Sequence, residues 1–133
     1  MSRDMIEQGL GWRWTPGRVR ENLLDNDTNV VVAYDNLKLI GFGIMKYRYE
    51  EAHLMLLAVA DSHRRRGVGS ALVSWLESSA LIAGIGCIYL EARQINNGAR
   101  DFYRQLGYRE IRTVRGYYQG REHAVQIAKD LWA

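Results

Sequence analysis

The segment that most constrains this chain is a basic, glycine-containing loop, Arg-Arg-Arg-Gly-Val-Gly-Ser, at residues 64–70. It follows an apolar run at residues 54–59 and leads into an amphipathic run at residues 68–82. This order predicts a strand, a tight turn and the start of a helix. Glycines allow a close approach to a ligand, and the free N–H groups at a helix start favour an anion. The loop therefore predicts a site for the phosphates of a nucleotide-like or CoA-like molecule.

The length and charge of the chain limit the classes of protein to which it can belong. With 133 residues, it fits one domain with one core, covering residues 1–133. Its 18 basic and 15 acidic residues are interspersed, and the net charge of +3 suits an anionic cofactor better than nucleic acid. Residues 1–8 carry charges and lack an apolar block, and the longest weakly polar run, residues 81–90, is about half a membrane span. We therefore expect a cytoplasmic protein without a nucleic-acid or membrane partner.

Local patterns predict an α/β (α+β) domain with a mixed sheet and helices on its faces. Thr15 and Pro16 signal a short helix over residues 16–24. Strands are expected over residues 29–34, 39–49 and 53–59, as an antiparallel meander, and later over residues 87–92, 108–114 and 123–129. A helix over residues 68–82 should bury a stripe of four residues, Leu72, Trp75, Leu76 and Ala80. Asn96 should cap a further helix that ends near residue 106.

Two motifs in this order resemble the cofactor-side segments of the GNAT superfamily of N-acetyltransferases. The first is Leu57-Ala58-Val59 followed by Arg64-x-x-Gly67-x-Gly69, and the second is Asn96-x-x-Ala99-x-x-Phe102-Tyr103-x-x-x-Gly107-Tyr108. The resemblance covers residues 30–131. It implies a GNAT-like, mostly antiparallel sheet flanked by helices, and an enzyme that uses acetyl-CoA as cosubstrate and needs no metal.

Within that superfamily, the chain is most similar to the N-terminal protein acetyltransferases, and above all to the bacterial ribosomal-protein alanine N-acetyltransferases. The similarity lies in Leu90-Glu91-Ala92-Arg93 and in Tyr117-Tyr118 ahead of Ala124. It implies that the favoured acceptor is the α-amino group of a protein or peptide. A small-molecule amine, a lysine side chain and a non-catalytic CoA-binding module remain alternatives.

The chain also departs from these relatives. Only 11 residues precede Trp12, so we expect the family's first strand to be missing, and a homodimer is one way to supply it. Gly116 stands before the tyrosine pair, where the relatives often carry a polar residue. Both departures concern the acceptor side.

The resemblance implies a set of acetyl-CoA contacts. Backbone N–H groups of Arg66, Gly67, Val68, Gly69 and Ser70 would hold the pyrophosphate, whereas an ordinary helix-capping loop is the alternative. The Arg64 side chain would pair with a phosphate or lie in solvent. The strand that carries Leu57 and Val59 would meet the acetyl and pantetheine part, where two neighbouring strands splay apart. Asn96 would contact the pantetheine arm in addition to capping its helix.

The resemblance also implies the catalytic pair, Tyr103 and Glu91. The Tyr103 hydroxyl would protonate the departing CoA thiolate, although helix spacing alone makes this residue a core tyrosine. Glu91 would accept a proton from the incoming ammonium, which must lose it before attack. Partial burial would raise the pKa of this carboxyl and suit it to the task. The alternative is a surface glutamate that pairs with Arg93 or another base.

The remaining candidate residues serve the acceptor or have no assigned chemistry. Tyr117 and Tyr118 could hold a substrate N-terminus, but adjacent residues of an extended strand point to opposite faces, so one would merely pack. The three histidines, His53, His63 and His123, lack metal-ligand spacing. Cys87, the only cysteine, is expected to be a small core residue, so that transfer is direct.

Overall fold

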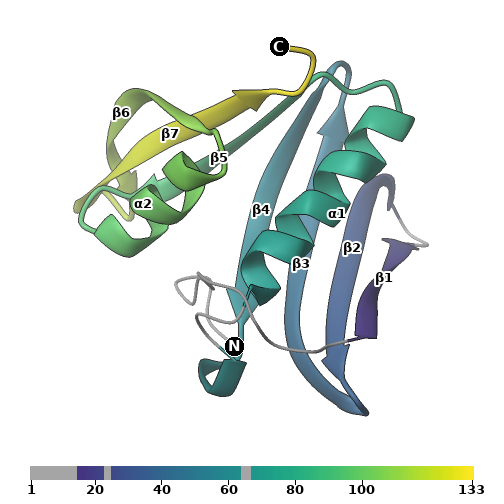
Figure 1. Cartoon of the computed structure of the whole chain (residues 1–133). Helices are drawn as coiled ribbons and strands as arrows, with labels where there is room; N and C mark the ends of the chain where they lie inside the picture. The colour runs from purple at the N-terminus through teal and green to yellow at the C-terminus, as the bar shows by residue number, and fades with distance from the viewer. Residues whose placement is uncertain (1–14, 23–24, 64–66) are drawn as a thin grey trace.

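Seven strands form one mixed sheet in the computed structural model, which describes residues 15–22, 25–63 and 67–133 (Figure 1). All neighbouring strands are antiparallel except β4 and β5, which are parallel. Across the sheet the strands are β1 Thr15–Asn22, β2 Asp25–Asp35, β3 Lys38–Arg48, β4 Glu51–Val59, β5 Cys87–Arg93, β7 Glu122–Asp130 and β6 Arg109–Tyr118. A short 3-10 helix, Asp61–His63, follows β4, and the α-helices are α1, Val68–Ile82, and α2, Asn97–Gln105. The mixed, mostly antiparallel fold expected from the sequence is confirmed.

The first described element differs from its prediction. Residues 16–24 were expected to form a helix, but β1 lies there and pairs with β2 in antiparallel register, Val19 opposite Val31. A strand therefore precedes the meander. The physical reason is that a nine-residue helix is marginal in isolation. Pairing along β2 satisfies the same backbone groups in the sheet. The family's first strand, expected to be missing ahead of Trp12, would fall on residues 1–14, which lie outside the described residues.

Helix α1 lies close against the sheet because β3 offers it glycines. A Cβ atom on Gly41 would stand 3.1 Å from Val68 Cγ1 and 3.2 Å from Leu72 Cδ1, and one on Gly43 would stand 3.0 Å from Leu76 Cδ1. Only small residues fit there. The helix buries Val68, Gly69, Leu72, Val73, Leu76 and Ala80, whereas Trp75, expected within the buried stripe, is 37% exposed.

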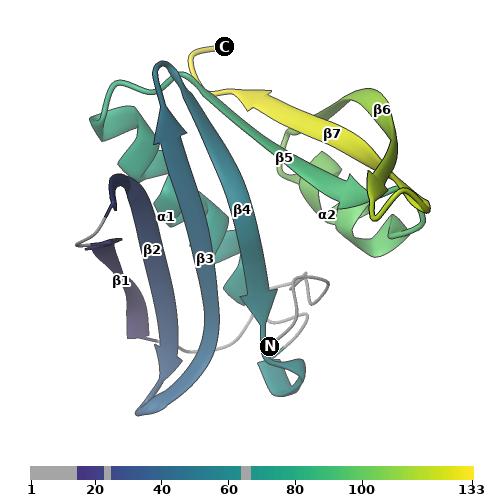
Figure 2. The same ribbon diagram turned by 180° about the vertical axis from the view of Figure 1, so that it is seen from behind.

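Both α-helices cover the same face of the sheet. They lie in front of it in Figure 1 and behind it in the reverse view of Figure 2. Helix α1 contacts β2, β3 and β4, whereas α2 contacts β6. Among the described residues, no helix is both long enough and apolar enough to cross a membrane.

The two halves of the sheet separate between β4 and β5. These strands share only three pairs, which end at His53 opposite Tyr89, although β4 continues to Val59 and β5 to Arg93 (Figure 2). Strand β4 also carries one extra residue, Met55, between Leu54 and Leu56 in its pairing with β3. Such a bulge bends the strand that contains it. The parallel ladder thus ends early and the strands diverge.

A polar network ties the diverging halves together. The Tyr108 hydroxyl donates to Glu77 Oε2 of α1 at 2.8 Å, and Lys129 Nζ of β7 lies 3.3 Å from the same carboxylate. Lys129 also donates to the Leu106 carbonyl at 2.9 Å. Burial, followed by the nearby Glu77 charge, raises the pKa of Tyr108 and keeps its hydroxyl a donor. The network fixes α1 against the half that carries α2.

Candidate active site

A cavity of about 160 Å³ occupies the space between the diverging ends of β4 and β5. Six of the residues predicted for the site line it: Leu57, Glu91, Asn96, Tyr103, Tyr117 and Tyr118. They come from β4, β5, helix α2 with its N-cap and the end of β6. The fold therefore brings together side chains that are far apart in the sequence.

The cavity can be reached from both faces of the sheet. Leu90 and Ala92 of β5 are buried in the core, and because strand side chains alternate, Glu91 lies on the opposite face. Tyr103 approaches the same cavity from α2, on the helical face. Glu91 and Tyr103 therefore reach one cavity from opposite faces of the sheet.

The Tyr103 side chain is held rigidly in the core. It is 3% exposed, and its ring packs edge-on against Phe102 and Tyr108, with centroids 4.9 Å and 5.5 Å apart. Burial raises the pKa of this phenol, so it stays protonated at neutral pH. Tyr103 is therefore a proton or hydrogen-bond donor at the cavity wall.

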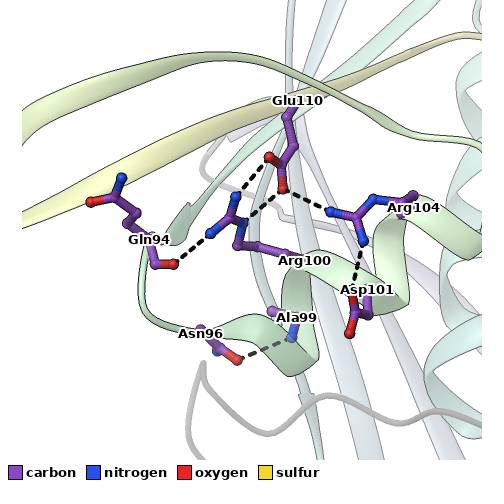
Figure 3. Close-up of polar contacts among 7 residues, drawn as sticks. All are labelled: Gln94, Asn96, Ala99, Arg100, Asp101, Arg104 and Glu110. Carbon is purple, nitrogen blue, oxygen red and sulfur yellow. Dashed lines mark hydrogen bonds and ion pairs between the residues drawn. The ribbon is translucent and has the colours of Figure 1, made fainter.

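Helix α2 is anchored at its start by side-chain contacts (Figure 3). Asn96 Oδ1 accepts from the Ala99 N–H at 3.0 Å, which confirms the predicted cap. Arg100 donates to the Gln94 carbonyl at 2.8 Å and to both carboxylate oxygens of Glu110, at 2.8 Å and 2.9 Å. The hydrogen bond from Arg100 lowers the pKa of Glu110 and keeps it ionised. These contacts set the position of both Asn96 and Tyr103.

Glu91 is paired with a histidine for which the sequence indicates no role. His53 Nε2 lies 2.6 Å from Glu91 Oε1, and the Tyr117 hydroxyl donates to the same oxygen at 3.3 Å. Burial acts to raise the pKa of Glu91, but the hydrogen bond and charge of His53, aided by Gln126 and Tyr117, outweigh it and lower the pKa. The expected upward shift is therefore wrong, because the neighbouring His53 outweighs the effect of burial.

His53 could be found only through the register of the sheet. It stands opposite Tyr89 in the last parallel pair, and the two rings stack with centroids 4.4 Å apart. Nothing in the spacing of the histidines along the chain indicates this placement. The stacking fixes the imidazole beside Glu91, on the face away from the helices.

Both tyrosines at the end of β6 reach the cavity. An extended strand would point them to opposite faces, but their ring centroids lie 4.9 Å apart and both line the cavity. Arg93 lies over the Tyr118 ring at 5.1 Å and forms an ion pair with Glu122 at 3.0 Å. Neither tyrosine is therefore confined to packing away from the cavity. Arg93 pairs with Glu122, and the other base that the surface-glutamate alternative left open is His53.

The glycine loop leads into α1 as expected, although its described residues, 67–70, do not line the cavity. Gly67 adopts a left-handed conformation, φ 84°, without a side-chain cap, and the first helical hydrogen bond is from the Ala71 N–H to the Gly67 carbonyl. The helix itself therefore offers no acceptor to the N–H groups of Val68, Gly69 and Ser70. Arg64 and Arg66 lie outside the described residues. Val59, fully buried, ends β4 and belongs to the core.

Two other predictions concern cysteine and metals. Cys87 is only half-buried, and it lines a separate pocket with Tyr49 and Trp132 rather than the cavity between β4 and β5. In the part of the chain that the structure describes, no group of three or more His, Cys, Asp or Glu side chains could hold a metal ion.

Comparisons with known proteins agree with this architecture. The profile of the acetyltransferase (GNAT) family matches residues 3–108. The ribosomal protein bS18-alanine N-acetyltransferase of Haemophilus influenzae is 29% identical over 119 residues, which are 86% of this chain and 80% of that protein. The solved ribosomal-protein-S18-alanine N-acetyltransferase of Escherichia coli has a TM-score of 0.73 and 30% identity, covering 79% of this chain and 70% of that one.

The chain therefore belongs to the acetyltransferase (GNAT) family. A further solved structure, nourseothricin acetyltransferase, has a TM-score of 0.76 and 25% identity, with 95% of this chain and 91% of that chain covered. Relatives of similar likeness are thus named for different acceptors. The acceptor must be argued from the site.

The ionisation of Glu91 gives a direct test of the site. We expect its carboxyl to titrate below the ordinary glutamate pKa of about 4.3. In His53→Leu, burial remains and the partner is lost, so the pKa should rise. The stability that this depressed pKa contributes is present above the ordinary carboxyl pKa and is lost as pH falls through the folded value.

Carbon-detected NMR of the side-chain carboxyls, assigned with Glu91→Gln, measures both titrations. Glu110 is an internal control, since Arg100 keeps its pKa low in either protein. An unchanged Glu91 midpoint in His53→Leu would contradict the assignment.

Proposed function

We propose that this chain transfers the acetyl group of acetyl-CoA to the α-amino group of a protein or peptide. One observation carries the proposal: the His53–Glu91 pair and the protonated Tyr103 enter a single cavity from opposite faces of a divided sheet. Family membership supports the reaction, and the relatives named for alanine N-acetylation support the acceptor. The homodimer, the cytoplasmic location and the single-domain extent stay predictions from the sequence.

The donor side is assigned to the helical face. The N–H groups of Val68, Gly69 and Ser70 and the positive end of the α1 dipole suit a pyrophosphate, and Gly67 and Gly69 leave room for close approach. Arg64 and Arg66 are assigned to the same anion from the sequence alone. Leu57 and Asn96 line the cavity, and we assign the pantetheine arm to them. When bound, acetyl-CoA supplies an acetyl group activated as a thioester.

The acceptor side is assigned to the face that carries Glu91. An ionised carboxylate attracts an incoming ammonium, and the ammonium must lose a proton before its nitrogen can attack. When His53 is neutral and its Nε2–H donates to Glu91, the lone pair of Nδ1 is the free base of the pair. We assign the proton to the Glu91–His53 pair, since a carboxyl with a lowered pKa is a weak base by itself.

Tyr103 completes the transfer on the donor side. Its hydroxyl is protonated at neutral pH and lines the cavity, so it can donate to the sulfur that leaves. Because amine and thioester approach from opposite faces, the cavity holds them in attack geometry, which is a large part of the rate gain. Cys87 lines another pocket, which supports direct transfer.

The acceptor is tested with the purified protein, acetyl-CoA and three sets of amines. The sets are peptides with a free N-terminal alanine, the same peptides with a blocked N-terminus and an internal lysine, and nourseothricin. We expect CoA release and an acetylated α-amine only with the first set, read by mass spectrometry. Acetylated lysine or nourseothricin alone would move the function to the alternative acceptors, and binding of acetyl-CoA without CoA release would indicate a non-catalytic module.

The donor site is tested at the start of α1. Gly67→Glu places bulk and negative charge where the pyrophosphate is assigned, so we expect no acetyl-CoA binding in calorimetry. Gly84→Glu is the matched control, because Gly84 also has a left-handed φ of 81° and lies just beyond the other end of α1, with no atom within 4 Å of its Cβ position. Equal affinity in both variants would refute the donor site.

The role of Tyr103 is tested by removing one oxygen atom. Tyr103→Phe keeps the packing against Phe102 and Tyr108 and removes the donor, so kcat should fall by about a hundredfold or more. Affinity for acetyl-CoA should stay near that of the wild type, because the assigned anion contacts are at α1. Steady-state kinetics and calorimetry measure the two quantities. Full turnover would exclude the donor role.

A further inference from the structure

The end of β6 contains a bulge that is closed by one glycine and one histidine. Regular pairing with β7 stops at Val114 opposite Ala124 and resumes at Tyr118 opposite Glu122, so residues 115–117 stand opposite His123 alone. Gly116 lies within this bulge with a φ of 63°. Its N–H donates to His123 Nδ1 at 2.9 Å, and its carbonyl accepts from the Gly120 N–H at 2.9 Å. Hydrogen bonds at both the N–H and the carbonyl of Gly116 thus fix the bulge.

The bulge changes where the two tyrosines lie. Strands β6 and β5 are not neighbours, because β7 lies between them. The Tyr117 hydroxyl nevertheless reaches Glu91 of β5, at 3.3 Å, and its ring lies beside that of Tyr118. A regular strand would point the two rings to opposite faces. Bulges re-aim the side chains that they carry, so this one accounts for both rings at the cavity wall.

We propose that Gly116 and His123 are positioning residues for the acceptor. The bulge that they close holds Tyr117 and Tyr118 against the mouth of the cavity, where the acceptor amine meets Glu91. The inference rests on the proposed function, since it assigns these tyrosines to the acceptor and not to the donor. The acceptor that fits is a primary amine on an extended chain that lies along the two aromatic rings.

Both positions have strict chemical requirements. A left-handed φ strains a β-branched residue, whereas asparagine tolerates it. Position 123 needs a hydrogen-bond acceptor close to its own backbone, which His Nδ1 supplies and which Asn Oδ1 can supply at a similar place. Gly116→Val and His123→Leu should therefore open the bulge. Gly116→Asn and His123→Asn should preserve it.

Steady-state kinetics with an N-terminal alanine peptide test the proposal. In Gly116→Val and His123→Leu, we expect KM for the peptide to rise about tenfold or more, while both asparagine variants stay near the wild type. The dissociation constant for acetyl-CoA should be unchanged in all four. Gly84→Val is the control for left-handed strain, because Gly84 has a φ of 81° and lies far along the chain from the bulge.

A second readout does not depend on activity. Opening the bulge removes the Tyr117 hydroxyl from Glu91, so the Glu91 carboxyl should titrate at a higher pH in Gly116→Val and not in Gly116→Asn. If the wild type acetylates none of the amines, the proposed function fails, and this titration alone decides whether the bulge positions Tyr117. An unchanged peptide KM in Gly116→Val, a parallel loss of acetyl-CoA affinity, or an unchanged titration would each overturn the inference.

Discussion

The early end of the parallel ladder between β4 and β5 is the constraint on which the site depends. Backbone pairing stops at His53 and Tyr89, and the Met55 bulge bends β4 away. The strand ends that follow line a cavity instead of bonding to each other. A sheet normally separates two faces, but here one cavity is reached from both. A polar network of Glu77, Tyr108 and Lys129 joins α1 to the half that carries α2, so the two halves stay connected across this opening.

The cavity places two ionisable groups in opposite states. Burial among aromatic rings keeps Tyr103 protonated, whereas His53 keeps the partly buried Glu91 ionised against the effect of burial. Two groups whose environments push their pKa values apart are suited to acid and base roles at one pH. This difference between the two pKa values follows from the fold, since Tyr103 comes from a helix packed in the core and Glu91 from the face without described helices.

Local signals predicted much of this molecule, and tertiary pairing accounts for what they missed. Residues 68–82 and the Asn96 cap were predictable because helix periodicity and capping act within a few residues. Strand β1 was predicted as a helix, since Pro16 is a local signal and pairing with β2 is not. Trp75 fitted the apolar stripe, but the side chains of α1 that meet Gly41 and Gly43 are Val68, Leu72 and Leu76, and Trp75 stays partly exposed.

Part of the candidate site was also predictable from the sequence, whereas the rest depends on how the strands pair. Glu91, Tyr103 and Asn96 were named through a family resemblance, and the structure brings all three to one cavity. His53 was not named, because its role depends on which β4 residue stands beside β5. The joint placement of Tyr117 and Tyr118 was not predictable either, because a bulge is a property of two strands.

The most direct measurement is a crystal structure with a bisubstrate analogue, in which an acetyl spacer joins the CoA sulfur to the α-nitrogen of an alanine peptide. The spacer should lie between Tyr103 and Glu91, with the diphosphate at residues 67–70 and the peptide on the face of His53. A spacer outside the cavity between β4 and β5, or a diphosphate seated away from the start of α1, would contradict this arrangement.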